Sequence, residues 1–443
     1  MDIETINTLI AENGVRTVIA AGTDPSGVLR GKRLTVPYFQ HAVKDGVGFS
    51  SYLLGTTTMD EVLPGLFDTG VPDVVGKIDL SSFRLAPWEE NTAIVLMDWQ
   101  TEHGEPHPLC PRSALKRQVA RAAEMGFSSK VGLELEFFLL PTPIQEIRQG
   151  KWTDLEPGSK DIHCYSVFEG YFFEPIVGKL RDCFPTEIEA CLPEWGQGQF
   201  EVNLYRADPV AMADVAVLVK LATKQIAAGA GATATFMAKL REDLSGSSGH
   251  IHMSLADIRT GTPVFHDPAR PNKLSETFEQ FVAGNLDVFR EATLFYLPNV
   301  NSYKRMQANS FAGTTRCWGL DNRTTGFRAI NESAGKTRLE VRIGGADLNP
   351  YHAIATGLGA GLRGIREKLT PPPMASGNTY EKEVETIPPS LAHAVAATEA
   401  SAAIRDILSP DLVENALRIA RFELGVFQGA VTDLDRRRYL ETV

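Results

Sequence analysis

Two kinds of hydrophobic periodicity run along the chain, and together they predict an α+β protein. Apolar residues recur at helical spacing over residues 2–12, 36–46 and 112–126. Longer helical patterns cover residues 208–229, 275–294, 349–369 and most of 393–427. Short β-rich runs predict strands at 92–99, 131–140, 199–204, 234–239, 250–255 and 338–343. Residues 15–36 predict a hairpin around the turn "DPSG".

A proline-rich polar segment divides these patterns into two groups. Residues 102–113, "EHGEPHPLCPRS", contain three prolines and predict a domain boundary. We therefore expect a small α+β domain over residues 1–105 and a large domain over residues 106–443, in which strands carry the polar residues. Residues 370–390 are again proline-rich, and we expect them to form a surface loop.

Composition and charge exclude several classes of function. The chain of 443 residues is 43% hydrophobic and 22% charged, as in ordinary soluble proteins. Its formal net charge of -11 argues against a nucleic-acid partner or an anionic membrane surface. The N-terminal residues lack the pattern of a signal peptide, and no apolar run reaches the length of about 20 residues that a membrane span needs. The five scattered cysteines, without a CxxC motif, predict reduced thiols in the cytoplasm.

Two carboxylates interrupt the most apolar of the predicted strands. In "VGLELEFFLL", Glu134 and Glu136 alternate with leucines and point to the same side of a strand. A Glu-x-Glu pair usually lies on an exposed sheet face, but the apolar neighbours leave little room for such a face here. Two like charges in an apolar setting are costly unless a positive charge lies between them. The stretch therefore predicts a site.

Further acids and histidines occur in similar strand contexts. They are Glu194 and Glu201 in "EWGQGQFE", His250 and His252 in "GSSGHIHMSL", and Glu340 between Arg338 and Arg342 in "RLEVR". Carboxylate oxygens favour Mg²⁺ or Mn²⁺ over Zn²⁺, and the set is large enough for two divalent cations. Arginines beside the acids suit phosphate groups. Together these residue types indicate metal-assisted phosphoryl transfer.

The motifs together resemble those of the glutamine synthetase superfamily, most closely its γ-glutamyl-amine ligase branch. The matching stretches include "GLELEFF", "EWGQGQFE", "GSSGHIHMSL", "NSYKR", "DNRTTGFR" and "RLEVRIGGADLNPYHAIA", in the family's order, over residues 132–355. The resemblance implies a small N-terminal β-grasp domain followed by a large catalytic domain with an antiparallel sheet and packed helices. It also implies a homo-oligomer, commonly a dodecamer of two hexameric rings, in which a neighbour's N-terminal domain completes each active site.

The resemblance also assigns roles to individual residues. Glu136, Glu194 and Glu201 would hold one metal ion, and Glu134, His250 and Glu340 the other. Arg305 and Arg342 would bind the carboxylate of the substrate glutamate, with Ser245 and Gly246 in the glutamate-binding loop. Arg323, Arg328 and Arg338 would stabilise the ATP phosphates, with Arg323, Arg328 and Glu340 as the catalytic group. His252, Ser254 and Glu189 would lie near the nucleotide. The implied reaction consumes ATP, requires two Mg²⁺ or Mn²⁺ ions per site and passes through γ-glutamyl phosphate.

Three departures from the family pattern bear on the second substrate. The Asp-Gly-Ser-Ser stretch that helps glutamine synthetases to bind ammonium is absent from "SSYLLGTTTMDEV". Phe311 occupies the position of a glutamate that closes the ammonium pocket, and Ser245 replaces an asparagine of the glutamate loop. Ammonium must be desolvated by carboxylates, whereas a phenyl ring offers apolar contact to a larger amine. We therefore expect a γ-glutamylamide ligase whose amine is not ammonia.

The identity of the amine stays open at this point. An arylamine or small alkylamine would suit Phe311, with Trp318 or Tyr52 as a further contact, whereas a polyamine would need acids such as Asp60 and Glu61. Tyr380 lies in a different context from the adenylylated tyrosine segment of some family members, so we expect no such control.

Three other functions compete with this expectation. The first is a glutamine synthetase that binds ammonium through other residues. The second is a non-catalytic structural or regulatory member of the family, which the six retained metal ligands disfavour. The third is a guanidino kinase of the same fold class, which the arginines of "NSYKR" and "RLEVR" disfavour because they suit an amino-acid carboxylate.

Overall fold

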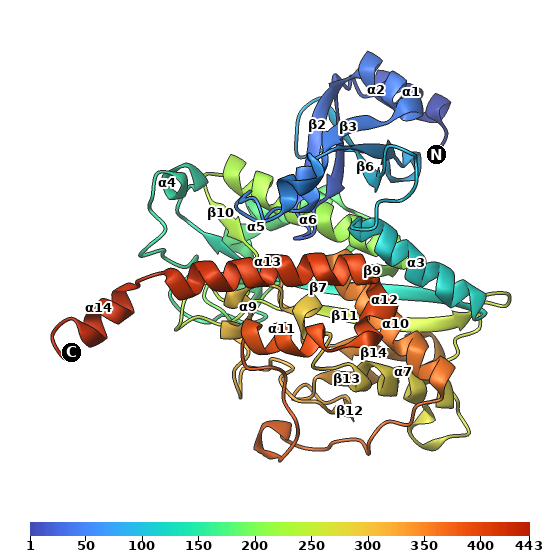
Figure 1. The fold of residues 1–443 in the computed structure, drawn as a ribbon, viewed down its shortest axis with the longest axis vertical. Helices are drawn as coiled ribbons and strands as arrows, with labels where there is room; N and C mark the ends of the chain where they lie inside the picture. The colour runs from blue at the N-terminus through green and yellow to red at the C-terminus, as the bar shows by residue number, and fades with distance from the viewer.

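The chain folds around two β-sheets that come from separate stretches of the sequence. The computed structural model describes the backbone of residues 1–443 and all side chains except those of residues 66 and 69. A six-stranded sheet lies between residues 17 and 100, and an eight-stranded sheet lies between residues 127 and 341. The N-terminal sheet and its helices stand at one end of the molecule, above the larger body that contains the second sheet (Figure 1).

The N-terminal sheet is mixed. Its order is β2-β1-β6-β4-β3, with β5 paired to β6, and only β1 and β6 run parallel. The strands are β1 (Thr17–Thr23), β2 (Leu29–Thr35), β3 (Val47–Ser50), β4 (Asp73–Ile78), β5 (Arg84–Leu85) and β6 (Thr92–Gln100). Helices α1 (Ile3–Glu12) and α2 (Val36–Asp45) pack on it, and Phe39 and Trp99 are the largest fully buried side chains of this core. The expected hairpin and both short helices are confirmed.

The second sheet is antiparallel except at one edge. Its order is β12-β13-β14-β11-β7-β9-β8, with β10 paired to β7, and only β12 and β13 are parallel. The strands are β7 (Phe127–Leu140), β8 (Ile188–Pro193), β9 (Gln199–Ala207), β10 (Thr233–Thr235), β11 (Gly249–Asp257), β12 (Trp318–Leu320), β13 (Phe327–Ile330) and β14 (Arg338–Val341).

The odd-numbered positions of the central strand β7 form the helix-covered face of this sheet. Val131, Leu133, Leu135 and Phe137 are buried in the main core, where β7 contacts α3 and α6. The helices that follow the N-terminal sheet in the chain, of which α3 and α6 contact β7, are α3 (Pro111–Glu124), α4 (Ile144–Arg148), α5 (Val167–Cys183), α6 (Pro209–Gly229), α7 (Glu276–Asp287), α8 (Thr293–Tyr296), α9 (Val300–Arg305), α10 (Pro350–Glu367), α11 (Leu391–Glu399), α12 (Ala402–Leu408), α13 (Pro410–Gly429) and α14 (Asp433–Tyr439). Because side chains alternate along a strand, the even-numbered residues of β7 face the opposite side.

Several expected elements differ from the structure. The strand expected over residues 234–239 ends at Thr235, and the helix expected over 275–294 ends at Asp287 and resumes at Thr293. The pattern over 393–427 contains three helices, α11, α12 and α13. Residues 370–390 form a loop with one short 3₁₀ turn, as expected. None of the described helices combines the length and apolarity of a membrane span.

One buried arginine joins the N-terminal unit to the helices of the second sheet. Arg112, at the start of α3, is 4% exposed and donates two hydrogen bonds to Asp214 of α6, at 2.9 and 2.8 Å. The same guanidinium lies 3.0 Å from Asp98 and 2.8 Å from Asp79 of the N-terminal unit. Burial alone would raise the pKa of Asp79, but a hydrogen bond from Ser81 and the charge of Arg112 outweigh it and lower that pKa to about 2.

Candidate active site

The register of the second sheet brings most of the predicted acids and histidines to one face. On one side of β7, His250 of β11 lies opposite Glu134, and on the other side Glu201 of β9 lies opposite Glu136. Farther along the sheet, Glu340 of β14 pairs with His252 of β11. All six positions share the face opposite the helix-covered core. The same-face arrangement expected for Glu134 and Glu136 is confirmed.

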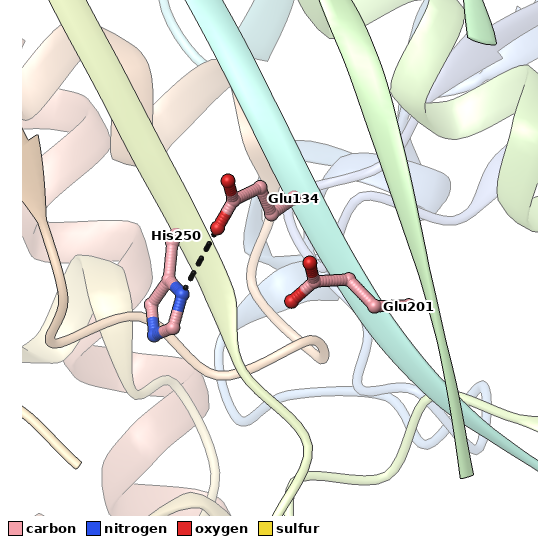
Figure 2. A group of neighbouring side chains, drawn as sticks. All are labelled: Glu134, Glu201 and His250. Carbon is pink, nitrogen blue, oxygen red and sulfur yellow. Dashed lines mark hydrogen bonds and ion pairs between the residues drawn. The ribbon is translucent and has the colours of Figure 1, made fainter. Parts of the chain in front are cut away.

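Two overlapping groups of side chains have the geometry of metal sites. Ligand atoms of Glu134, Glu201 and His250 lie within 4.8 Å of one another, and so do those of Glu134, His252 and Glu340. Figure 2 shows Glu134, Glu201 and His250 projecting from three adjacent strands toward a common point. His250 Nδ1 is 3.3 Å from Glu134 and 3.7 Å from Glu340. Glu134 therefore belongs to both groups.

At the acid-rich end of the site, burial and mutual repulsion of the carboxylates outweigh the nearby charge of Arg323. Burial, with repulsion from Glu136, raises the pKa of Glu194 to about 7. Burial and repulsion from neighbouring carboxylates likewise raise the pKa of Glu201 to about 9. Glu136 accepts hydrogen bonds from the Ser248 backbone at 2.6 Å and from Gln199 at 3.3 Å, which aim its carboxylate. A divalent cation here would offset the repulsion and keep these groups ionised.

The donor set fits a divalent cation. Burial and the charge of Arg342 lower the pKa of His250, so its imidazole is neutral, the form that binds metals. The Nε2 atom of His250 is buried and has no hydrogen-bond partner among the described residues. Carboxylates dominate the remaining donors, which suits Mg²⁺ or Mn²⁺.

Arginines surround Glu340 at the other end of the site. Glu340 is 1% exposed and accepts hydrogen bonds from Arg342 and, at 2.8 Å, from Arg328. Burial opposes its ionisation, but the Arg342 guanidinium outweighs this and lowers the pKa of Glu340 to about 2. Asp321, which the sequence interpretation did not include, holds the Arg328 guanidinium from the other side at 3.1 Å. Arg338 donates to His252 at 3.3 Å.

The predicted glutamate-binding residues lie beside the acids. Arg305 is 5% exposed and donates to the backbone carbonyl of Ile343 at 3.0 Å. A side chain on Gly246 would meet Arg305 Cγ at 2.4 Å, so only glycine allows this approach. Gln199 donates to the Gly246 carbonyl at 2.9 Å, and Ser245 donates to the Trp195 carbonyl at 3.0 Å. The loop is thus tied to the segment that carries Glu194.

Phe311 combines an exposed ring with an anchored backbone. Its side chain is 53% exposed, and its φ of 56° is in the left-handed region, which is unfavourable for a bulky residue. Its carbonyl accepts a hydrogen bond from Arg342 at 3.1 Å. Trp318, by contrast, is 4% exposed in the main core and donates to the Pro372 carbonyl, so its proposed contact with the amine is wrong.

The other predicted residues lie around this cluster. Arg323 is exposed and makes no ion pair with any described side chain. Ser254 is half-buried on β11, two residues beyond His252, and Glu189 is exposed on the edge strand β8.

One residue near the acids, Tyr165, was not predicted from the sequence. Tyr165 lies close enough to Glu194 that burial and this carboxylate raise the pKa of its hydroxyl. Its φ of 58° is again in the left-handed region, and its ring is 69% exposed. The run of aromatic residues from Tyr165 to Phe173 could have indicated a functional segment, because so many aromatic residues in one short segment seldom lie exposed without a function.

The fold and the site together define an enzyme with a carboxylate–histidine–arginine centre suited to divalent cations and phosphate groups. The family described as "Glutamine synthetase, catalytic domain" matches residues 108–439. The chain therefore belongs to the glutamine synthetase family and is an ATP-dependent carbon–nitrogen ligase, similar to the γ-glutamylamide ligase branch.

Individual relatives are similar over nearly the whole chain. A glutamate–isopropylamine ligase of a Pseudomonas species is 38% identical, over 99% of this chain and 98% of its own length. Type-1 glutamine synthetase 2 of Dictyostelium discoideum is 35% identical, over 96% of this chain and 83% of its own length. Gamma-glutamylethanolamide synthetase GlnA4 of Streptomyces coelicolor is 33% identical, over 100% of this chain and 96% of its own length. A solved structure described as a GmaS/ADP complex is 27% identical, covers 98% of this chain and 99% of its own, and has a TM-score of 0.87. The expected α+β fold is confirmed.

Proposed function

We propose that this enzyme joins the γ-carboxylate of L-glutamate to an amine larger than ammonia. ATP first phosphorylates the γ-carboxylate. The amine nitrogen then attacks the acyl carbon of γ-glutamyl phosphate, a proton leaves the nitrogen, and phosphate departs, giving a γ-glutamylamide and ADP. The relatives named as isopropylamine and ethanolamide ligases support this choice of product.

The phosphorylation step would take place on the face of the second sheet that carries the acids and histidines. Two Mg²⁺ or Mn²⁺ ions would neutralise charge on the ATP phosphates. The family resemblance assigns one ion to Glu136, Glu194 and Glu201 and the other to Glu134, His250 and Glu340. The two groups of ligand atoms in the structure are divided differently, because Glu134 lies with Glu201 and His250 in one group and with His252 and Glu340 in the other.

The protein's own cations assist the same step. Arg323 has no carboxylate partner among the described side chains and is free to bind phosphate, whereas Arg328 is held in place by Asp321 and Glu340. Arg305 lies against the loop around Gly246, and Arg342 lies near Arg305, so the two guanidinium groups would bind the glutamate carboxylate together.

Phe311 is the single observation that carries the choice of amine. An ammonium ion needs an acid to replace its water, and the exposed ring of Phe311 provides apolar surface instead. The two acids considered for a polyamine already have partners, because Asp60 pairs with Arg30 at 2.8 Å and Glu61 accepts from Thr57 at 2.8 Å. These contacts favour a small monoamine or a neutral arylamine over spermine.

An amine panel tests the proposal. ADP release would be measured with ATP, glutamate and either ammonia, methylamine, isopropylamine, ethanolamine, putrescine, spermine or aniline, with the product identified by mass spectrometry. We expect the highest kcat/KM with one of the apolar monoamines or ethanolamine. Best turnover with ammonia would instead identify a glutamine synthetase, and best turnover with spermine would contradict the apolar pocket. Glutamate labelled with ¹⁸O in the γ-carboxylate must transfer one label to phosphate.

A further inference from the structure

A cavity lies on the helix-covered side of the large sheet, on the opposite side from the acids of the candidate active site. Its volume is about 470 Å³, within the range of small-molecule sites. Helix α6, the segment around Phe236 and helix α13 line it, and the turn Pro25–Leu29 of the N-terminal hairpin forms another part of its wall. Phe236 contacts Phe137, a core-facing residue of β7, with ring centroids 5.3 Å apart. The sheet therefore separates this cavity from the candidate active site.

Two adjacent lysines of α6 bring positive charge to the cavity. Lys220 and Lys224 lie one helical turn apart, and their ammonium nitrogens are 5.7 and 5.9 Å from the centre of the Phe236 ring. Neither has an acidic partner within 4.0 Å among the described side chains. Burial lowers the pKa of Lys220 to about 7, and the charge of Lys224 contributes. Asp347 also lines the cavity and places one negative charge near Lys220, whereas Lys224 is exposed to solvent. Two ammonium groups beside one carboxylate leave a net positive charge, which a bound anion would balance.

The rest of the lining is mainly apolar. Val217 and Leu221 of α6, Leu412 and Ile419 of α13, and Leu294 of α8 contribute aliphatic side chains. An inorganic anion would leave this surface uncovered, whereas a molecule with an apolar body and one anionic group would cover it.

The cavity also joins parts of the chain that are far apart in sequence. Asn349, at the N-terminus of α10, donates to the Pro25 carbonyl at 3.0 Å, and a side chain on Gly27 would meet the Asn349 backbone at 3.0 Å. Lys220 donates to the Leu348 carbonyl at 3.0 Å, in the loop that follows Arg342 of the candidate active site. A ligand held by Lys220 would contact this loop and the N-terminal hairpin at once.

We propose that this cavity binds an amphipathic monocarboxylate, whose carboxylate pairs with Lys220 and Lys224 and whose hydrocarbon body lies between α6 and α13. The site is separate from the proposed ligase chemistry and does not depend on it. Charge-assisted hydrogen bonds to the two ammonium groups supply selectivity for an anion, and the aliphatic lining supplies affinity.

Isothermal titration of the full chain with octanoate tests this site. We expect saturable binding at one site per chain. Acetate lacks the apolar body, 1-octanol lacks the charge and octylammonium reverses it, so each should bind at least about tenfold more weakly. No saturable octanoate binding, or equal binding of octanoate and octylammonium, would overturn the proposal.

Variants distinguish this cavity from adventitious binding elsewhere. Lys220→Met with Lys224→Met removes both charges at nearly constant length, and Ala416→Trp fills the cavity from α13; each should weaken octanoate binding at least about tenfold. Lys179→Met, at an exposed lysine of α5 that pairs with no acid among the described side chains, is the matched control and should bind as the wild type does. Unchanged binding in both the double variant and Ala416→Trp, with folding verified by circular dichroism, would refute the assignment.

Discussion

Replacing Phe311 by glutamate is expected to move the enzyme's preference toward ammonia. The carbonyl of Phe311, not its ring, is held by Arg342, so the substitution leaves the anchored backbone in place and changes the exposed side chain. The new carboxylate faces the same space, where it can accept a hydrogen bond from ammonium. The apolar contact to a larger amine is lost at the same time.

The size of the shift follows from two contributions. Isopropylamine carries three carbons that ammonia lacks, and each buried carbon contributes up to about 0.8 kcal/mol. Because the Phe311 ring would cover only one side of the bound amine, about 1–2 kcal/mol of this burial energy is lost when the ring is removed. A charge-assisted hydrogen bond to ammonium contributes about 1.5–3 kcal/mol. The two contributions add, so the ratio of kcat/KM for isopropylamine to that for ammonia should fall by about 70-fold or more.

Steady-state ADP release with each amine, at saturating ATP and glutamate, measures this ratio. Phe427→Glu, which places the same charge on an exposed phenylalanine of α13, is the control and should leave the ratio unchanged. A Phe311→Glu enzyme with the wild-type ratio would refute the role of the ring.

Three further predictions concern the ion pairs of Arg112, which join the N-terminal unit to helix α6, and the metal site. Arg112→Met removes the cation that pairs with the partly buried Asp214 and leaves Asp79 and Asp98 with Lys116 alone, so it should lower the free energy of unfolding in urea by about 3–5 kcal/mol. Lys116→Met, at the more exposed cation of the network, should cost under about 1 kcal/mol. Asp79→Asn should cost about 2 kcal/mol at pH 7, because the pKa of Asp79 falls from 3.8 to about 2 on folding; this deficit persists down to about pH 4 and shrinks as the pH falls toward 2. A deficit that grew with acidity would contradict the assignment. Glu201→Gln should lower the Mn²⁺ bound per chain in equilibrium dialysis from two ions toward one, and two tightly bound ions would exclude Glu201 as a ligand.

The strands that carry the site were predictable where apolar and polar residues alternate strictly. In residues 131–137 and 250–255, the odd positions enter the core and the even positions include the acids and histidines, as the alternation indicates. The alternation ends at Phe137, and Phe138 and Leu140 are buried in a small separate core cluster. The placement of Glu201 opposite Glu136 was not predictable from spacing, because it depends on the register of β9 against β7, which shifts between Val131 and Leu133.

The elements that were missed have weak or misleading patterns. Helix α5 contains Pro175 and exposes Phe168 and Tyr171, so its apolar residues do not form a single buried stripe. Strand β8 is an edge strand with mostly half-exposed residues, and β12 and β13 have three and four residues. Tyr165 lies just before α5 and Asp321 just after β12, and no local pattern shows which residue each one contacts across the fold.

A direct competition between two amines tests the central claim. The enzyme would be given ATP, glutamate and equal concentrations of ammonia and isopropylamine, and glutamine and γ-glutamylisopropylamide would be quantified by mass spectrometry at low conversion. The product ratio then equals the ratio of the two kcat/KM values. An excess of the γ-glutamylamide is the result predicted from Phe311 and the missing acids; an excess of glutamine would contradict it.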